Sequence, residues 1–246
     1  MFELKLPFFL LLLFLTTFII IWRIKTRKFI SSGSVASAYD SWTQDKLLER
    51  LWGEHIHLGF YNLGEKNIDF RMAKIQFVHE LVKWSGLDKL PKGSRILDVG
   101  CGIGGSARIL AKYYGFNVTG ITISPAQVKR ARELTSSELS CNFQVMDALD
   151  LNFEDGTFDA VWSVEAGAHM SDKAKFADEI LRTLRPGGYL ALADWNSRDL
   201  RAYPPSFFEK LVLKQLLEQW VHPNFISKPS FIIHVCACLN TPNSVK

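Results

Sequence analysis

The stretch "RILDVGCGIGGSARILAKYYGFNVTGITIS", residues 95–124, decides the fold. It runs from a short apolar segment through a glycine-rich loop and a helical pattern to a second apolar segment. This order is typical of a strand, a loop, a helix and a second, parallel strand. The question that follows is which ligand the glycine-rich loop holds.

The glycines fit two motifs that imply different ligands. Gly100, Gly102 and Gly105 form G-x-G-x-x-G, which places a dinucleotide pyrophosphate at a helix N-terminus. Gly100, Gly102 and Gly104 also form G-x-G-x-G directly after a carboxylate, Asp98. The first motif predicts a redox enzyme, whereas the second predicts a ligand that carries no phosphate.

The remainder of the chain predicts an α/β fold of three layers, a doubly wound, Rossmann-like parallel sheet with helices on both faces. Apolar runs alternate with helical patterns, as they do in such sheets. A preceding helix over 70–85, stopped by Gly86, is expected to pack on the sheet. Pro186 is expected to stop the last helix of the series. The predicted strands are 95–99, 117–122, 143–148, 158–164 and 189–195, and the predicted helices between them are 104–114, 125–134 and 172–184.

The residues that follow each strand favour S-adenosylmethionine over a dinucleotide. Ligands of open parallel sheets lie at the carboxyl ends of the strands. Asp98 would repel a pyrophosphate there but suits an ammonium group. The second strand ends without the acid that a dinucleotide ribose requires. After the third strand, Asp147 could accept from the adenine amino group while the backbone at Ala148 donates to the ring, although a cap or turn role for Asp147 stays open.

Residues 6–22 form an uncharged apolar run that predicts a membrane anchor. At about 1.5 Å per helical residue the run nearly spans a hydrocarbon core of ~30 Å. A basic cluster follows it, with no small-residue cleavage site between, which favours a retained anchor over a cleaved signal peptide. The positive-inside bias places the bulk of the chain on the cytoplasmic or stromal side of the membrane.

Composition restricts the remaining possibilities. The chain of 246 residues carries a net charge of +4, and the cluster after the apolar run supplies four positive charges, so the rest is close to neutral. This argues against a nucleic-acid surface. The four cysteines show no C-x-x-C spacing, which favours a reducing compartment.

At this point the sequence resembles the class I methyltransferases, and from residue 35 to about 225 it is similar to their tocopherol-pathway branch. The motifs that carry the resemblance are "DVGCGIGGSARILAKYYGFNVTGITISPAQVKRA", "WSVEAGAHMSDKAKFA" and "ADWNSRDL". Two longer stretches, "AYDSWTQDKLLERLWGEHIHLGFY" and "ADWNSRDLRAYPPSFFEKLVLKQLLEQWVHP", are most similar to the cyanobacterial-type enzymes that methylate methyl-phytyl-benzoquinol.

The resemblance implies methyl transfer from S-adenosylmethionine to a ring carbon of a methyl-phytyl- or methyl-solanesyl-benzoquinol in tocopherol or plastoquinone biosynthesis. Gamma-tocopherol methylation is the alternative activity. The resemblance also implies that Thr122 and Gln127 replace the missing acid at the ribose. The cofactor-binding residues expected in total are Asp98, Gly100, Cys101, Gly102, Gly104, Thr122, Gln127, Asp147, Ala148 and Glu165.

Ring methylation also needs a base, because an aromatic carbon is a poor nucleophile until a ring hydroxyl loses its proton. Glu165 and His169 follow the fourth strand and are the first candidates. If the segment is helical, residues four apart share a face, and Glu165 could then orient the imidazole and raise its pKa. The alternative is that Glu165 caps the next helix, near Ser171, and His169 only packs.

A second cluster, "EHIHLGFY", places His55 and His57 in H-x-H. On a strand both imidazoles would face one way, as metal ligands do, but no third ligand stands out, so no metal is expected. A lid over the substrate, with Trp52, Phe60 and Tyr61 against the ring, makes His57 a further catalytic candidate. A third interpretation is that the aromatic side chains of this cluster only pack against the core.

The organisation expected from these patterns has five parts. The C-terminal part holds an amphipathic helix over 206–220, which either covers the core or contacts the bilayer that dissolves the prenyl tail. Beyond about residue 225 the chain departs from the family pattern, so the last two strands of the sheet are expected to be missing, and a truncated protein that binds the cofactor without activity is a second possibility. The parts are 1–28, anchor; 29–38, linker; 39–90, lid and substrate segment; 91–199, cofactor-binding core; and 200–246, substrate- and membrane-facing segment.

Overall fold

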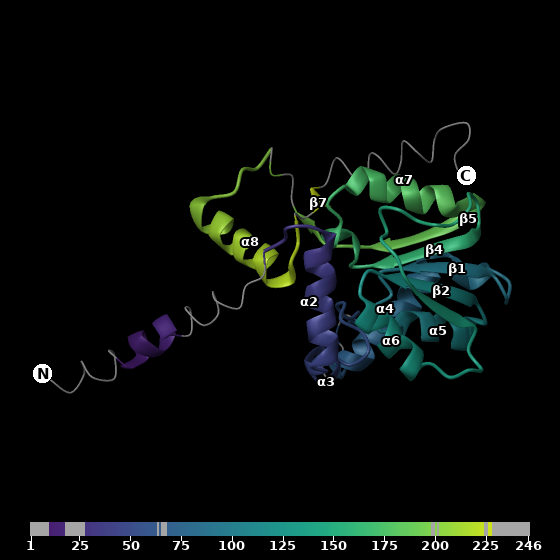
Figure 1. The fold of residues 1–246 in the computed structure, drawn as a ribbon, viewed down its shortest axis with the longest axis horizontal. Helices are drawn as coiled ribbons and strands as arrows, with labels where there is room; N and C mark the ends of the chain where they lie inside the picture. The colour runs from purple at the N-terminus through teal and green to yellow at the C-terminus, as the bar shows by residue number, and fades with distance from the viewer. Residues whose placement is uncertain are drawn as a thin grey trace, which may run out of the picture.

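A five-stranded parallel sheet forms the centre of the computed structural model (Figure 1). The structure describes residues 10–17, 28–62, 64, 68–197, 200, 202–223 and 226–227. The strand order is β3-β2-β1-β4-β5, with chain order reversing between β1 and β4. The strands are β1 Arg95–Val99, β2 Asn117–Thr122, β3 Cys141–Val145, β4 Phe158–Val164 and β5 Leu184–Ala193.

Side-chain alternation along β1 assigns its residues to two cores, one on each face. Ile96 packs with α4 and α5, whereas Leu97 packs on the other face with α7. This is the period-2 pattern of a strand buried on both sides. Figure 1 shows α7 on one face of the sheet and the other three helices on the opposite face. The helices are α4 Phe70–Ser85, α5 Gly105–Tyr114, α6 Pro125–Leu134 and α7 Lys173–Thr183.

The predicted three-layer fold is confirmed, and two of its boundaries are corrected. β3 ends at Val145 rather than at 148, because Asp147 accepts from the backbone N–H groups of Leu149 and Asp150 and turns the chain. Pro186 does not stop α7, which has already ended at Thr183. The "RPGG" segment instead lies within β5, where the register with β4 shifts.

The predicted linker over 29–38 is wrong in its main part, since α2 runs from Ser32 to Gln44. Its serines and glycine suggested a loop, but Val35 and Ala38 are buried at helical spacing. Asp40 fixes α2 to the N-terminus of α6, where its Oδ1 accepts from Ser124 Oγ at 2.5 Å and from the Ala126 N–H at 3.0 Å. A carboxylate at a helix N-terminus is favourable because of the helix dipole.

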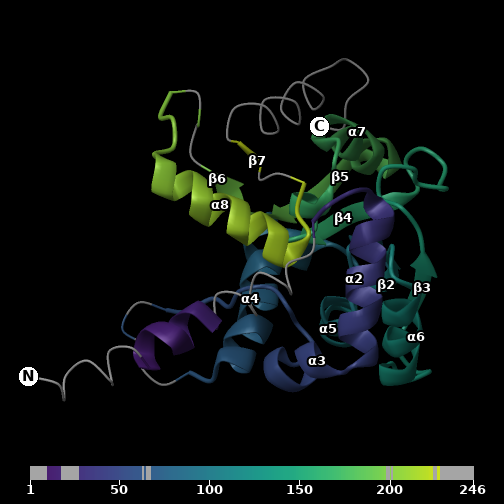
Figure 2. The same ribbon diagram turned by 60° about the vertical axis from the view of Figure 1, so that its left-hand side comes forward.

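Two terminal elements lie outside the three layers. α3 spans Leu47–Trp52 and follows α2, and α8 spans Phe207–Trp220. Figures 1 and 2 both show α8 apart from the sheet, with its C-terminal end near α2. There Trp220 meets Trp42 edge to face, with ring centroids 6.0 Å apart. The short strands β6 Asn196–Ser197 and β7 Ile226–Ser227 pair with each other and not with the main sheet.

The predicted anchor and the predicted C-terminal loss fall mostly outside the described residues. Of the apolar run over 6–22, the structure describes residues 10–17, which are helical. Among the residues that the structure describes, none lies in a helix that is both long and apolar enough to cross a bilayer. Residues 228–246 likewise lie outside the description, and the described part of the sheet ends at β5.

Asp40→Ala is expected to lower the free energy of unfolding by about 1–3 kcal/mol, because it removes two hydrogen bonds to a charged group. Chemical denaturation measures the change. Asp45→Ala, an exposed carboxylate at the other end of α2, is the control and should stay within about 0.5 kcal/mol of the parent. Equal stability of the two variants would contradict the role given to Asp40.

Candidate active site

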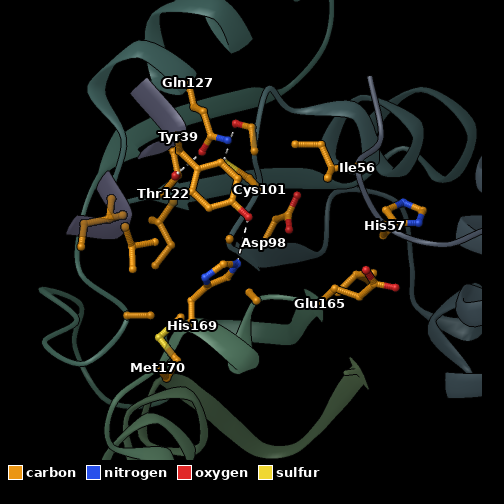
Figure 3. Close-up of a pocket in the computed structure, with 18 of the residues that line it drawn as sticks. Tyr39, Ile56, His57, Asp98, Cys101, Thr122, Gln127, Glu165, His169 and Met170 are labelled. Atoms are coloured by element: carbon orange, nitrogen blue, oxygen red, sulfur yellow. Dashed lines mark hydrogen bonds between the residues drawn. The ribbon is translucent and has the colours of Figure 1, made fainter. Parts of the chain in front are cut away.

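A pocket of about 390 Å³ opens at the carboxyl ends of β1, β2 and β4, where ligands of open parallel sheets lie. Figure 3 shows side chains from the glycine loop, from α2 and from the segment after β4 converging on it. Every cofactor-binding candidate named from the sequence lines the pocket, except Gly104. Those that line the pocket are Asp98, Gly100, Cys101, Gly102, Thr122, Gln127, Asp147, Ala148 and Glu165.

Gly104 has a structural role instead. It lies outside the pocket lining and precedes α5 with φ +82°, in the left-handed region that favours glycine. A Cβ there would come within 2.7 Å of the Phe143 ring. Gly104 therefore allows the loop to pack closely against Phe143, on the side away from the pocket. Its two neighbours in sequence, Ile103 and Gly105, line the pocket.

Asp98 is the most unusual polar group of the pocket. Asp98 lies near the end of β1 and is only 2% exposed. Its Oδ2 has no hydrogen-bond partner among the described residues. Burial raises the pKa of the carboxyl to about 7. An unsatisfied buried carboxylate is costly unless a positive group or a donor meets it, so this atom points to a cationic or donor ligand.

The glycines beside Asp98 keep the loop close to the neighbouring strand ends. Gly100 has φ +78°, and a Cβ there would clash with Ala166 after β4. Gly102 has φ +54° and faces the pocket. Because neither position has a side chain, a ligand can lie directly on the backbone of the loop.

The end of β2 supplies a buried pair of polar side chains. Thr122 Oγ1 donates to Gln127 Oε1 at 2.6 Å, so the amide nitrogen of Gln127 is left for other partners. Ser124 caps α6 by accepting from the Gln127 N–H. Gln127 is thus fixed at both backbone and side chain, which suits a residue that positions a ligand hydroxyl.

Asp147 stabilises a turn and also lies in the pocket lining, so the turn role does not exclude the binding role. One carboxylate oxygen accepts from the Leu149 N–H at 2.9 Å in a turn, and the residue also lines the pocket beside Ala148. The turn fixes the direction of the carboxylate, so the structural role supports a binding role.

Glu165 follows β4 in a strained conformation and points into the pocket, as Figure 3 shows. Its φ of +53° lies in the left-handed region, which costs a residue with a side chain about 1–3 kcal/mol. Oε1 accepts from the Leu58 N–H at 3.0 Å. Burial raises the pKa of the carboxyl, which makes the carboxylate a stronger base than an exposed glutamate.

His169 does not pair with Glu165, so the predicted orientation of the imidazole by the carboxylate is wrong. The residue ends a 3-10 turn, η2 Gly167–His169, and its Nε2 lies 2.8 Å from the hydroxyl of Tyr39. Burial lowers the pKa of His169 to about 3, opposite to the predicted rise. The ring is therefore neutral at physiological pH. The cap of α7 is Asp172, so Glu165 has no capping role there either.

Lys173 holds the turn that carries His169. Its ammonium donates to the backbone carbonyls of Gly167, Ala168 and Met170, at 2.5–3.2 Å. Burial lowers the pKa of Lys173 to about 8. One side chain thus donates to three carbonyl groups of a tight turn, and that of Gly167 also accepts from the Met170 N–H.

His55 and His57 lie in a loop and not on a strand, and they bond to each other. His55 Nδ1 and His57 Nε2 are 3.1 Å apart, and His57 Nδ1 is 2.7 Å from the Leu58 carbonyl. Burial lowers their pKa values to about 3 and about 4, so both are neutral donors and acceptors. The pair fixes the backbone around Leu58, whose carbonyl lies next to His57 Nδ1 and whose N–H donates to Glu165. Within the described residues no cluster of three or more potential ligand side chains could hold a metal ion.

Part of the predicted lid lines the pocket. Trp52 and His57 line the pocket, whereas Phe60 and Tyr61 do not line it and are 38% and 53% exposed. Lys74 fixes this segment by donating to the carbonyls of Trp52 and His55, at 3.1 and 2.8 Å.

Tyr39 is the functional candidate that sequence reasoning missed. It lines the pocket from α2, and burial and the charge of Glu165 raise the pKa of its hydroxyl well above the usual value. The signal was present in the spacing of Val35, Tyr39 and Trp42, which is helical, but the small polar residues around it suggested a linker.

Comparisons with known proteins agree with this geometry. Residues 97–192 match the family described as methyltransferase domain. The chain is 60% identical over 205 residues to 2-methyl-6-phytyl-1,4-hydroquinone methyltransferase of Synechocystis sp., with 83% of this chain and 64% of that protein covered. It is 32% identical over 208 residues to norajmaline N-methyltransferase of Rauvolfia serpentina, covering 81% of this chain and 71% of that one. A putative sarcosine dimethylglycine methyltransferase from Galdieria sulphuraria superposes with a TM-score of 0.68 at 24% identity, over 79% of this chain and 72% of that chain.

The chain belongs to the class I methyltransferases. The TM-score confirms the Rossmann-like fold. The chain spans less than two thirds of the length of its Synechocystis relative.

Lys173→Met is expected to lower the free energy of unfolding by about 1–3 kcal/mol, because it leaves buried carbonyl groups without a donor. Denaturant titration measures this, and hydrogen exchange should show faster opening of residues 167–170. Lys175→Met, an exposed lysine of the same helix, is the matched control. If both variants are equally stable and exchange alike, Lys173 does not hold the turn.

Proposed function

We propose that the chain carries the catalytic domain of an S-adenosylmethionine-dependent enzyme that methylates a ring carbon of a prenylated hydroquinone. The observation that carries the proposal is the buried, unpartnered Oδ2 of Asp98 beneath a glycine loop. A pyrophosphate could not occupy this position, whereas an amino acid's ammonium group satisfies it. The identity to the Synechocystis enzyme supports the hydroquinone as acceptor.

The remaining pocket residues fit the rest of the cofactor. Gly100 and Gly102 leave room for the methionine portion against the loop backbone. Gln127 can donate to a ribose hydroxyl, and Asp147 can accept from the adenine amino group. Bound there, the cofactor supplies an electrophilic methyl group on a sulfonium sulfur.

The protein's own contribution is to orient the acceptor, exclude water and remove a proton. Methyl transfer is an in-line displacement, so its barrier falls when the ring carbon is held in near-attack geometry. The aromatic and histidine side chains of the pocket provide that enclosure. They are Tyr39, Trp52, His57, His169 and Trp195.

Glu165 is the base in this proposal. It is an acceptor-only group when ionised, its pKa is raised by burial, and the Leu58 N–H fixes its direction. Tyr39 and His169 form a second unit: the neutral imidazole accepts from the tyrosine hydroxyl, whose oxygen can then accept from the other ring hydroxyl of the substrate. This unit positions the ring while Glu165 takes the proton.

The affinity for S-adenosylhomocysteine should depend on pH through Asp98. The carboxyl has a pKa of about 7 in the free protein, so below pH 7 binding must first release its proton. Affinity therefore falls about tenfold for each pH unit below 7 and is constant above it. Calorimetry measures this. Asp98→Asn should abolish the dependence and weaken binding above pH 7 by about 1.5–3 kcal/mol, whereas Asp88→Asn, an exposed carboxylate, should retain the parent profile.

Glu165→Gln should lower kcat by about 10²–10⁴-fold while the affinity for S-adenosylhomocysteine changes little. His169→Ala and Tyr39→Phe should each cost less, and the double variant should cost no more than the worse single one, because the two residues act as a unit. Steady-state kinetics measure these effects, with Glu80→Gln, outside the pocket, as the control. A larger loss in His169→Ala than in Glu165→Gln would make the imidazole the base.

The proposed location of the domain is the surface of a cyanobacterial or plastid membrane, to which residues 6–22 attach it. The support is the uncharged composition of the run and the basic cluster after it. Deleting residues 1–28 should release the protein into the soluble fraction and leave turnover of a short-tailed hydroquinone in place. If the shortened protein still sediments with membranes in high salt, α8 and not residues 6–22 is the segment that binds the membrane. Phe207 and Phe208 of α8 are 70% and 77% exposed.

A further inference from the structure

A second hollow adjoins the active site between α8 and the residues that precede α2. Its volume is about 420 Å³, and Phe29 and His222 line both it and the catalytic pocket. The two spaces are therefore neighbours that share these two side chains as a common wall. The ring centroids of His222 and His169 lie 4.3 Å apart. The wall that the two spaces share therefore reaches the turn Gly167–His169.

On either side of Phe29 and His222, the exposed lining of the two spaces is mainly apolar. On the pocket side it includes Val35 and Trp220, and on the outer side Leu213 and Leu217. Charged side chains also line the outer hollow, where Lys214 and Glu218 lie 4.0 Å apart. Apolar side chains on both sides of a shared wall, next to a polar pocket, fit a ligand with a polar ring and a hydrocarbon tail, and the aliphatic stems of the lysines can pack along such a tail.

We propose that this region binds the isoprenoid tail of the substrate while the hydroquinone ring lies between Glu165 and His169. We call it the tail channel, and it is formed by Phe29, Val35, Leu213, Leu217, Trp220 and His222. The proposal rests on the function proposed above, and it adds the path of the tail and the residues that select its length. It commits to a hydrocarbon chain because the outer hollow adjoins the site that binds the ring and its exposed lining is mainly apolar.

The energetic consequence is a dependence of KM on tail length. Each buried methylene contributes about 0.8 kcal/mol, so two buried tail carbons are worth about tenfold in affinity. Acceptors with no tail, two isoprene units and four isoprene units should therefore show falling KM at similar kcat. The kcat values should agree because the tail lies away from the reacting carbon.

The test compares two neighbouring residues of α8 that face different ways. Leu213 lines the channel, whereas Val212 is 60% exposed and lines neither space. Leu213→Glu places a charge in the path of the tail and should reduce the ratio of kcat/KM for the four-unit acceptor over the tail-free acceptor by at least tenfold. Val212→Glu should leave that ratio as in the parent. A titration with S-adenosylhomocysteine checks that each variant is folded.

A second readout does not depend on turnover. Geranylgeraniol, the tail without a ring, should change the intrinsic tryptophan fluorescence of the parent protein and of Val212→Glu, and should do so at least tenfold more weakly in Leu213→Glu. Trp220→Phe should reduce the signal, because that indole lines the channel.

The outcomes separate the channel from the proposed function. If geranylgeraniol binds as expected but no hydroquinone is methylated, the channel stands and the proposed function fails. If hydroquinones are methylated with a KM independent of tail length, or if both glutamate variants change the length dependence equally, the tail channel is overturned. A length dependence that appears only with membrane vesicles present would also overturn it, since the bilayer would then hold the tail.

Discussion

The carboxylate of Asp98 is buried at the end of the central strand without a partner for one of its oxygens, and much of the pocket is arranged around it. Burying a charge in this way is costly and is sustained only by the fold around it. Parallel pairing with β2 and β4 fixes the end of β1 from both sides, and Gly100 and Cys101 donate to the same carbonyl of β2. The ligand therefore completes the electrostatics of the site, which links the stability of the sheet to binding.

Two segments that line the same pocket are each fixed by a lysine, one buried and one half-buried. Lys74 donates to carbonyls of the segment before Leu58, and Lys173 donates to those of the turn that carries His169. Both lysines have pKa values lowered to about 8 by burial, so they remain donors at neutral pH. In each case the ammonium group positions backbone, and the backbone positions Glu165 or His169. The positions of the two proposed catalytic side chains thus depend on lysines that act through the backbone.

The sheet and most of the candidate residues that line its pocket could be predicted from the sequence because both follow from local pattern. Parallel strands bring their carboxyl ends to one edge, so the residues after each strand collect in space wherever the strands are identified. The partners of the catalytic side chains could not be predicted in this way. Tyr39 and His169 are 130 residues apart, and a helix that begins with small polar residues suggested a linker. The four-residue spacing of Glu165 and His169 implied a shared helical face, but the left-handed conformation of Glu165 and the 3-10 turn after it direct the two side chains to different partners.

The proposed role of the glycine loop and Asp98 is to bind the ammonium group of S-adenosylmethionine and not a pyrophosphate. Isothermal titration of the full chain with S-adenosylhomocysteine and, separately, with nicotinamide adenine dinucleotide distinguishes the two. We expect saturable one-to-one binding of S-adenosylhomocysteine, weakened in Asp98→Asn, and no binding of the dinucleotide at the same concentrations. Saturable binding of the dinucleotide, with none of S-adenosylhomocysteine, would contradict it.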